Sequence, residues 1–257
     1  DLADALTAEV ARPFNLAEGP FLRVALWRTG PDEHVLLLVL HHAAADGWSV
    51  GVLLREAAAL YAGHALPPLG LTVYDWAQAV RQRDTAADVA FWRDWLADAV
   101  PPRLPMQERG GPGLVRRGLP AGLADAARAL RVTPFVLGAA AWAAVLARRA
   151  DAPDLLLGTV LAGRDHPETE AFVGMLVQTL PLRLDLRDDP VGETLAARMM
   201  AALEVAHAHR GAPFDAIVGA GGQAGAGADA LLPHLVVLQN QPWPSGGLPG
   251  LVAEEVV

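Results

Sequence analysis

The chain of 257 residues contains no cysteine and no lysine. Without cysteine it can form no disulfide, and it can use no thiolate as a nucleophile or a metal ligand. Its 20 positive side chains are therefore all arginine, and 29 aspartates and glutamates outnumber them. The net charge of -9 argues against a nucleic-acid partner, because such a partner favours a basic face.

The sequence also shows neither a signal peptide nor an apolar run close to the roughly 20 residues that a membrane span needs. We therefore expect no membrane association and a cytoplasmic location. With 53% hydrophobic and 19% charged residues, the chain can bury a core in one large domain or two modest ones.

The most informative stretch runs from Val35 to Tyr61. Its first six residues are all apolar, too few for an independent helix, and they predict a strand buried on both faces. From Val50 onward the apolar residues recur at helical spacing. His41 and His42 therefore lie where a central strand ends, and such a strand end holds a side chain rigidly while it reaches a substrate.

A single histidine beside an apolar run is more often a core residue than a catalytic one. Two adjacent histidines, followed by Asp46, Gly47, Trp48 and Ser49, favour function, because polar groups this closely spaced at one strand end need partners. Neighbouring strand residues point to opposite faces, so we expect one histidine to be catalytic and the other structural. The same divergence argues against a metal site made of His41, His42 and Asp46.

Other patterns predict an alternation of strands and helices. The expected strands are residues 21–27, 34–40, 154–160, 176–186 and 235–240, the first two being antiparallel neighbours. The further expected helices are residues 72–83, 84–100, 121–131, 134–149 and 192–209, and residues 219–228 are expected to be a loop without structure of its own. Thr133 and Pro134 fit the N-cap and first position of a helix.

The segment HHAAADGWS, His41 to Ser49, resembles the HHxxxDG motif of the condensation domains of nonribosomal peptide synthetases. Four further stretches are similar to segments of that family and follow in its order: residues 11–28, 155–164, 173–186 and 206–218. The resemblance thus runs over nearly the whole chain. It implies an α/β (α+β) protein with the two-lobed chloramphenicol-acetyltransferase-like fold, in which each lobe is a mixed sheet with flanking helices.

Residues 101–113 are rich in proline and glycine, so we place a linker there, between an N-terminal lobe, residues 1–100, and a C-terminal lobe, residues 114–257. Members of the resembled family are longer at both ends. We therefore expect both lobes to be partial, and residues 1–257 alone either to bind carrier proteins without turnover or to be poorly soluble.

The resemblance implies roles for individual residues. His42, the second histidine of the motif, is the expected catalytic base or amine-positioning group, and the Gly47 amide is expected to face the oxyanion. Asp46 is implied to be a structural anion paired with Arg164, and His41 is expected to be structural. The expected substrate-binding residues are Trp48, Ser49, Gln178, where the family usually has asparagine, and Asn240.

In the resembled family, the amine of an aminoacyl group attacks the thioester of an acyl or peptidyl group, and an amide forms. Both groups are carried on phosphopantetheine, so the resemblance implies donor and acceptor peptidyl carrier proteins and adenylation domains as partners, with no bound cofactor. The alternatives are another HHxxxDG acyltransferase of the wax-ester-synthase type, an epimerization domain, and a catalytically inactive recruitment domain. The Gly-Arg, TLPLR and PFD stretches favour a condensation domain over the wax-ester-synthase type. The run after the motif favours it over an epimerization domain. The intact motif argues against a catalytically inactive recruitment domain.

Overall fold

The computed structural model describes residues 1–105, 113–223, 228–239, 248 and 250–252, which form two compact units. Unit 1 consists of residues 1–81, residues 162–177 and the described residues from 239 onward. Unit 2 consists of residues 82–161 and the described part of residues 178–238. This division differs from the expected boundary at residues 101–113, because Trp92 and Leu96 are buried in the core of unit 2. Residues 106–112 of the expected linker lie outside the described residues.

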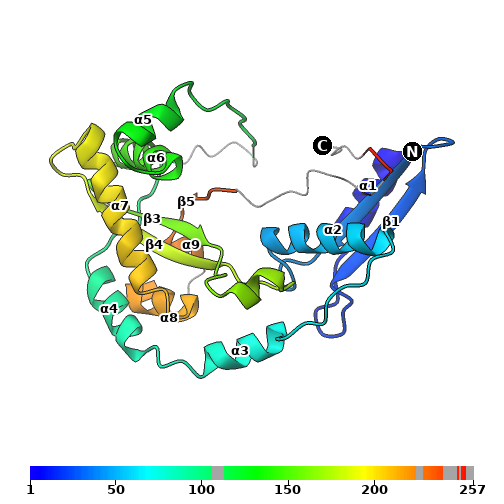
Figure 1. The fold of residues 1–257 in the computed structure, drawn as a ribbon. Coiled ribbons are helices and arrows are strands. Elements are labelled where there is room, and N and C mark those ends of the chain that lie inside the picture. The colour runs from blue at the N-terminus through cyan, green and yellow to red at the C-terminus, as the bar shows by residue number, and fades with distance from the viewer. Residues whose placement is uncertain (106–112, 224–227, 240–247, 249, 253–257) are drawn as a thin grey trace. The chain divides into compact units, whose positions relative to one another are not determined.

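Among its described residues, unit 1 contains an antiparallel strand pair and several helices (Figure 1). Its elements are α1 (Leu2–Ala11), β1 (Leu22–Arg28), β2 (His34–Leu40), α2 (Gly47–Tyr61), α3 (Val73–Arg81) and the short 3-10 helix η1 (Pro167–Ala171). The register pairs Leu22 with Leu40 and Arg28 with His34, which confirms the predicted antiparallel neighbours.

The prediction that the second strand is buried on both faces is wrong for the part of the chain that the structure describes. Leu36 of β2 is 49% exposed, and Val24 and Leu26 of β1 are exposed as well. These side chains share one face of the pair, because Val24 lies opposite Leu38 and Leu26 opposite Leu36. An all-apolar run is therefore not sufficient evidence of burial on both sides.

Unit 2 is built on a mixed three-stranded sheet in the order β4-β3-β5 (Figure 1). Strand β3 (Asp154–Leu161) pairs antiparallel with β4 (Gln178–Asp185) and parallel with β5 (Leu235–Val236). The helices are α4 (Ala86–Leu96), α5 (Leu123–Ala129), α6 (Pro134–Ala150), α7 (Gly192–Ala208), α8 (Phe214–Val218), the π-helical turn η2 (Gly219–Gln223) and α9 (Ala228–Leu231).

The core of unit 2 lies between β3, β4 and the helices α6 and α7. Helix α7 packs on β4, and α6 packs on α7 and β3. Leu155, Leu157 and Leu182 are fully buried there, and each would cost about 2 to 5 kcal/mol if truncated to alanine. Helix α6 begins as predicted, with the Thr133 side chain accepting a hydrogen bond from the Val136 amide and Pro134 at the first helical position.

Two predictions for unit 2 need correction. Residues 219–223 form a turn of π-helical type that is interrupted at Gly222, whose φ is +73°, and residues 224–227 lie outside the described residues. The last strand covers only Leu235 and Val236, where residues 235–240 were expected. A short glycine-rich helical turn has no apolar periodicity by which a sequence could reveal it.

Within the described residues, no single helix is long and apolar enough to cross a membrane. Helices α5 and α6 satisfy the length and composition criteria when taken together, and they are bent by 99° to each other.

Candidate active site around the His41–Ser49 turn

The turn between β2 and α2 holds its first histidine in place by several contacts. The His41 amide donates to the Phe21 carbonyl (3.0 Å), and the His41 Nδ1 atom accepts a hydrogen bond from the Ala43 amide (3.1 Å). The imidazole lies edge-on to Phe14, with ring centroids 5.6 Å apart, and near Phe21. His41 is therefore a half-buried residue that fixes the start of the turn.

His42 differs from its neighbour in both burial and bonding. Its side chain is exposed, and it makes no hydrogen bond to any residue that the structure describes. Only the backbone of the turn sets its position. The expected division into a structural and a catalytic histidine stays a prediction.

The other end of the turn is fixed by Asp46, the N-cap of α2. Its side chain is fully buried and accepts hydrogen bonds from the Ser49 amide (2.9 Å), the Ser49 hydroxyl (2.7 Å) and the Leu176 amide (3.1 Å). The Ser49 hydroxyl also lies 3.4 Å from the Asp46 amide, so the two residues complete a capping box. Asp46 and Ser49 thus define where α2 begins.

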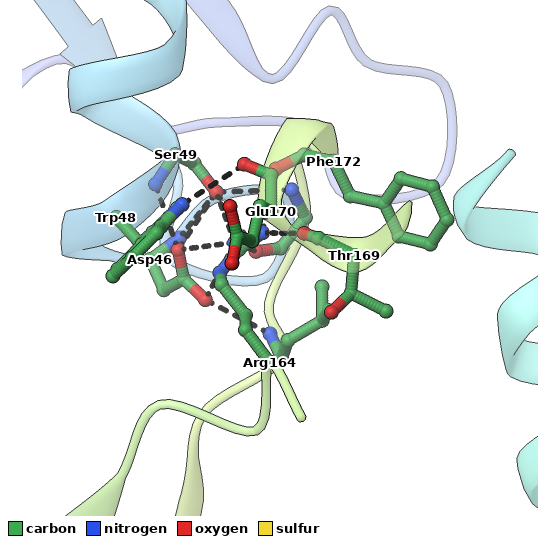
Figure 2. A network of polar contacts seen from close by, with 9 residues as sticks. Asp46, Trp48, Ser49, Arg164, Thr169, Glu170 and Phe172 are labelled. Atoms are coloured by element: carbon green, nitrogen blue, oxygen red, sulfur yellow. Dashed lines mark hydrogen bonds and ion pairs between the residues drawn. The ribbon is translucent and has the colours of Figure 1, made fainter. Parts of the chain in front are cut away.

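Arg164 neutralises this buried carboxylate (Figure 2). Its Nη2 atom lies 2.9 Å from Oδ1 and 3.1 Å from Oδ2 of Asp46, and its side chain is only 2% exposed. The Nη1 atom donates to the carbonyls of Thr169 (2.5 Å) and Phe172 (2.9 Å). The guanidinium therefore joins the start of α2 to the backbone that follows Arg164 along the chain.

Burial and hydrogen bonding have opposite effects on the pKa of Asp46. Burial by itself raises it, because a charged carboxylate is less well solvated inside the protein. The hydrogen bonds from Ser49 and Leu176, together with the positive charge of Arg164, outweigh that effect and place the pKa of Asp46 below its ordinary value. Asp46 is therefore ionised at neutral pH.

We call residues 162–177 the strap. The strands β3 and β4 on either side of it belong to unit 2, whereas the strap itself belongs to unit 1. Asp46 binds it near both ends, through Arg164 and through the Leu176 amide. The two ends also pack closely, since a Cβ atom on Gly163, whose φ is +66°, would overlap the Leu176 carbonyl.

Trp48 and Ser49 were expected to bind substrate, and the structure shows both bonded to the strap (Figure 2). The Trp48 indole donates to the Glu170 carbonyl (3.0 Å), and its ring lies 5.7 Å from the Arg164 guanidinium carbon. Ser49 is fully buried, and its hydrogen bonds go to protein groups. Within the described residues, both side chains hold the strap in place.

The structure gives less information about the remaining predicted site residues. Gly47 is the first residue of α2, is exposed and does not have a positive φ angle, and its expected role towards the oxyanion stays a prediction. Gln178 belongs to unit 2, where it begins β4 opposite Leu161, and its substrate role stays a prediction. Asn240 lies outside the described residues.

Sequence reasoning missed the groups of the strap that bind Asp46, Ser49 and Arg164. They are the backbone amides of Gly174 and Leu176 and the carbonyls of Thr169, Phe172 and Gly174. Every residue carries these groups, so residue type gives no signal of which ones are used. The Gly163-Arg164 pair at a strand end was the one local indication.

Two histidines directly after a strand, an aspartate-capped helix and a buried aspartate–arginine pair are the features expected of the condensation class. The condensation domain family model matches residues 1–249, and the chain belongs to that family. The family and the structural matches confirm the predicted chloramphenicol-acetyltransferase-like fold of class α/β.

Three similar proteins extend this assignment. Malpibaldin synthetase from Mortierella alpina is 35% identical over 233 residues, which are 82% of this chain and 4% of the synthetase. The X-domain from teicoplanin biosynthesis superposes with a TM-score of 0.80 at 29% identity, covering 97% of this chain and 62% of that one. The X-domain in its complex with OxyB superposes with a TM-score of 0.74 at 31% identity, covering 88% of this chain and 55% of that one.

Proposed function

We propose that the condensation domain to which this chain belongs catalyses amide formation between a carrier-bound acyl or peptidyl thioester and the amine of a carrier-bound aminoacyl group. The amine nitrogen attacks the thioester carbonyl and gives up a proton, and the sulfur of the donor arm leaves with the electron pair of the broken C–S bond and takes up a proton to become the thiol. The match to nonribosomal peptide synthetase kk1B from Curvularia clavata, of which this chain covers 2%, supports the proposal.

The observation that carries the proposal is the contrast between His42 and Asp46. The Asp46 carboxylate oxygens are occupied by Ser49, Leu176 and Arg164, so the aspartate is not available to orient His42 as a triad would require. His42 is exposed and free of hydrogen bonds to described residues. It is therefore suited to accept the proton of the amine or to position that amine.

The same proposal covers the partners. Donor and acceptor carrier proteins present the two substrates on phosphopantetheine arms, neighbouring adenylation domains load them, and the chain itself holds no cofactor. In this proposal the Gly47 amide stabilises the oxyanion that develops on the thioester carbonyl, and its position at the exposed start of α2 supports that role. A cytoplasmic location completes the proposal.

The test uses the full-length protein with carrier proteins loaded with a panel of acyl and aminoacyl groups, and mass spectrometry of the acceptor carrier measures amide formation. We expect product from the wild type and a loss of at least about 100-fold in His42→Ala. His207→Ala, which removes an exposed histidine from α7, serves as the matched control and should retain activity. A wild type that makes no amide from any pair, or an active and folded His42→Ala variant, contradicts the proposal.

A second candidate function is recruitment of a partner enzyme without chemistry. The observation that favours it is the match to the X-domain that was solved together with OxyB. The two functions make different predictions for one experiment. A recruitment domain leaves the thioester donor unchanged with or without His42, whereas a condensation domain converts it in a His42-dependent manner.

A further inference from the structure

Ser49 uses the whole hydrogen-bonding capacity of its hydroxyl. The oxygen accepts from the Gly174 amide (3.0 Å) and from Arg164 Nη2 (3.1 Å), and it lies 3.4 Å from the Asp46 amide. Its single hydrogen can go to Asp46 Oδ1 (2.7 Å) or to the Gly174 carbonyl (2.9 Å). One buried hydroxyl thus connects the first turn of α2 with residues more than 100 positions later in the chain.

This hydroxyl also bears on the turn that carries His42. The turn is held at its start by His41, whose amide and Nδ1 atom are both bonded, and at its end by Asp46. The Ser49 hydroxyl binds both the amide side and the carboxylate side of Asp46. Because His42 has no side-chain hydrogen bond to described residues, its placement depends on the fixation of these two ends.

We infer that Ser49 is a positioning residue for the reaction proposed above, on which this inference rests. Its hydroxyl fixes the end of the turn against the strap, so that the imidazole of His42 has one location relative to the start of α2. Loss of the hydroxyl leaves the Gly174 amide without its partner, leaves the Gly174 carbonyl with only the 3.5 Å contact to Arg164 Nη2, and lets the end of the turn shift. A displacement of about 1 Å in a catalytic group can lower a rate by about 100-fold.

The inference also replaces the expected role of Ser49 in binding substrate. A fully buried side chain whose bonds all go to protein groups does not contact a substrate. A positioning residue and a substrate-binding residue differ in kinetics. Loss of the first lowers kcat, whereas loss of a substrate contact that is equally strong in the ground state and the transition state raises KM.

The experiment compares Ser49→Ala with Thr159→Val in the full-length protein. Thr159 is a matched control from unit 2, because it is also buried and its hydroxyl donates to a distant carbonyl, that of Val236 (3.0 Å). For each folded variant, kcat and KM for the acyl donor are measured, together with hydrogen exchange at the Gly174 amide.

We expect Ser49→Ala to lower kcat by about tenfold or more with KM within about twofold of the wild type, and to speed exchange at Gly174. Thr159→Val should keep both kcat and Gly174 exchange at the wild-type level. If Ser49→Ala does not fold, Ser49→Cys fills the site with a somewhat larger thiol that is only a weak hydrogen-bonding group, and the same kcat loss is expected.

Two outcomes overturn the inference, and they differ from failure of the proposed function. A folded Ser49→Ala variant with wild-type kcat shows that the hydroxyl does not position His42, even if exchange at Gly174 rises. Unchanged exchange at Gly174 shows that the hydroxyl does not hold the strap. If the wild type itself makes no amide, the proposed reaction fails, and the exchange measurement still decides whether Ser49 holds the strap.

Discussion

Asp46 and Arg164 are separated by 118 positions in the chain and form a buried ion pair, with Arg164 Nη2 2.9 Å from one carboxylate oxygen of Asp46 and 3.1 Å from the other. The exposed fractions of the two side chains are 0% and 2%. Each partner has further hydrogen bonds that satisfy most of its remaining capacity. The pair therefore combines charge neutralisation with the placement of two backbone segments.

Removal of one partner of this pair should be strongly destabilising. We expect Asp46→Ala to lower the free energy of unfolding by about 3 to 5 kcal/mol, because it leaves the Arg164 charge buried without its partner. Urea unfolding followed by circular dichroism measures the change. Asp185→Ala, which breaks an exposed ion pair with Arg187, is the control and should have a much smaller effect. Equal effects of the two substitutions would contradict a structural role for Asp46.

The ion pair should also make stability depend on pH in the acid range. The folded state lowers the pKa of Asp46 below its ordinary value of 3.8, so its contribution is complete above that pH and is lost as the pH falls through the folded-state pKa. The unfolding midpoints of the wild type and Asp46→Asn should therefore converge as the pH is lowered below about 4. A gap between the two that widens on acidification would reverse the assigned sign.

Gly163 should be intolerant of a side chain. Its φ is +66°, and a Cβ atom would overlap the Leu176 carbonyl, so Gly163→Ala should cost more than the strain of the backbone angle alone. Gly63 is the matched control, because its φ is +80° and nothing lies within 4 Å of a Cβ placed there. We expect Gly163→Ala to lower the melting temperature by several degrees more than Gly63→Ala, as scanning calorimetry would show. Similar shifts for both would mean that the strap ends do not need to pack closely.

His41 and His42 should respond differently to truncation. His41→Ala removes a ring that contacts Phe14 and Phe21 and accepts the Ala43 amide, so we expect a loss of about 1 to 2 kcal/mol in the free energy of unfolding. His42→Ala should change that free energy by less than about 0.5 kcal/mol, because the side chain is exposed. Chemical denaturation of both variants provides the comparison. A larger stability loss in His42→Ala than in His41→Ala would mean that His42, and not His41, is the structural histidine.

The local features of the site follow from the sequence. The apolar run before His41, the helical spacing after Asp46 and the Thr133-Pro134 pair each lie within a few residues, and the structure forms β2, α2 and α6 there. The capping aspartate is likewise a local signal, because an N-cap side chain bonds to amides two or three residues ahead. The pairing of Asp46 with Arg164 was implied by the family resemblance, and the structure contains it.

Contacts between distant segments could not be predicted in the same way. The sequence by itself determined the strand end, the helix start, the polar residues of the turn and the family. Only the tertiary structure decided that Ser49 is buried, that Trp48 binds the Glu170 carbonyl, and that residues 82–100 pack in unit 2. The physical reason is that capping and periodicity depend on neighbours in the chain, whereas burial depends on which distant backbone groups and side chains pack against a residue.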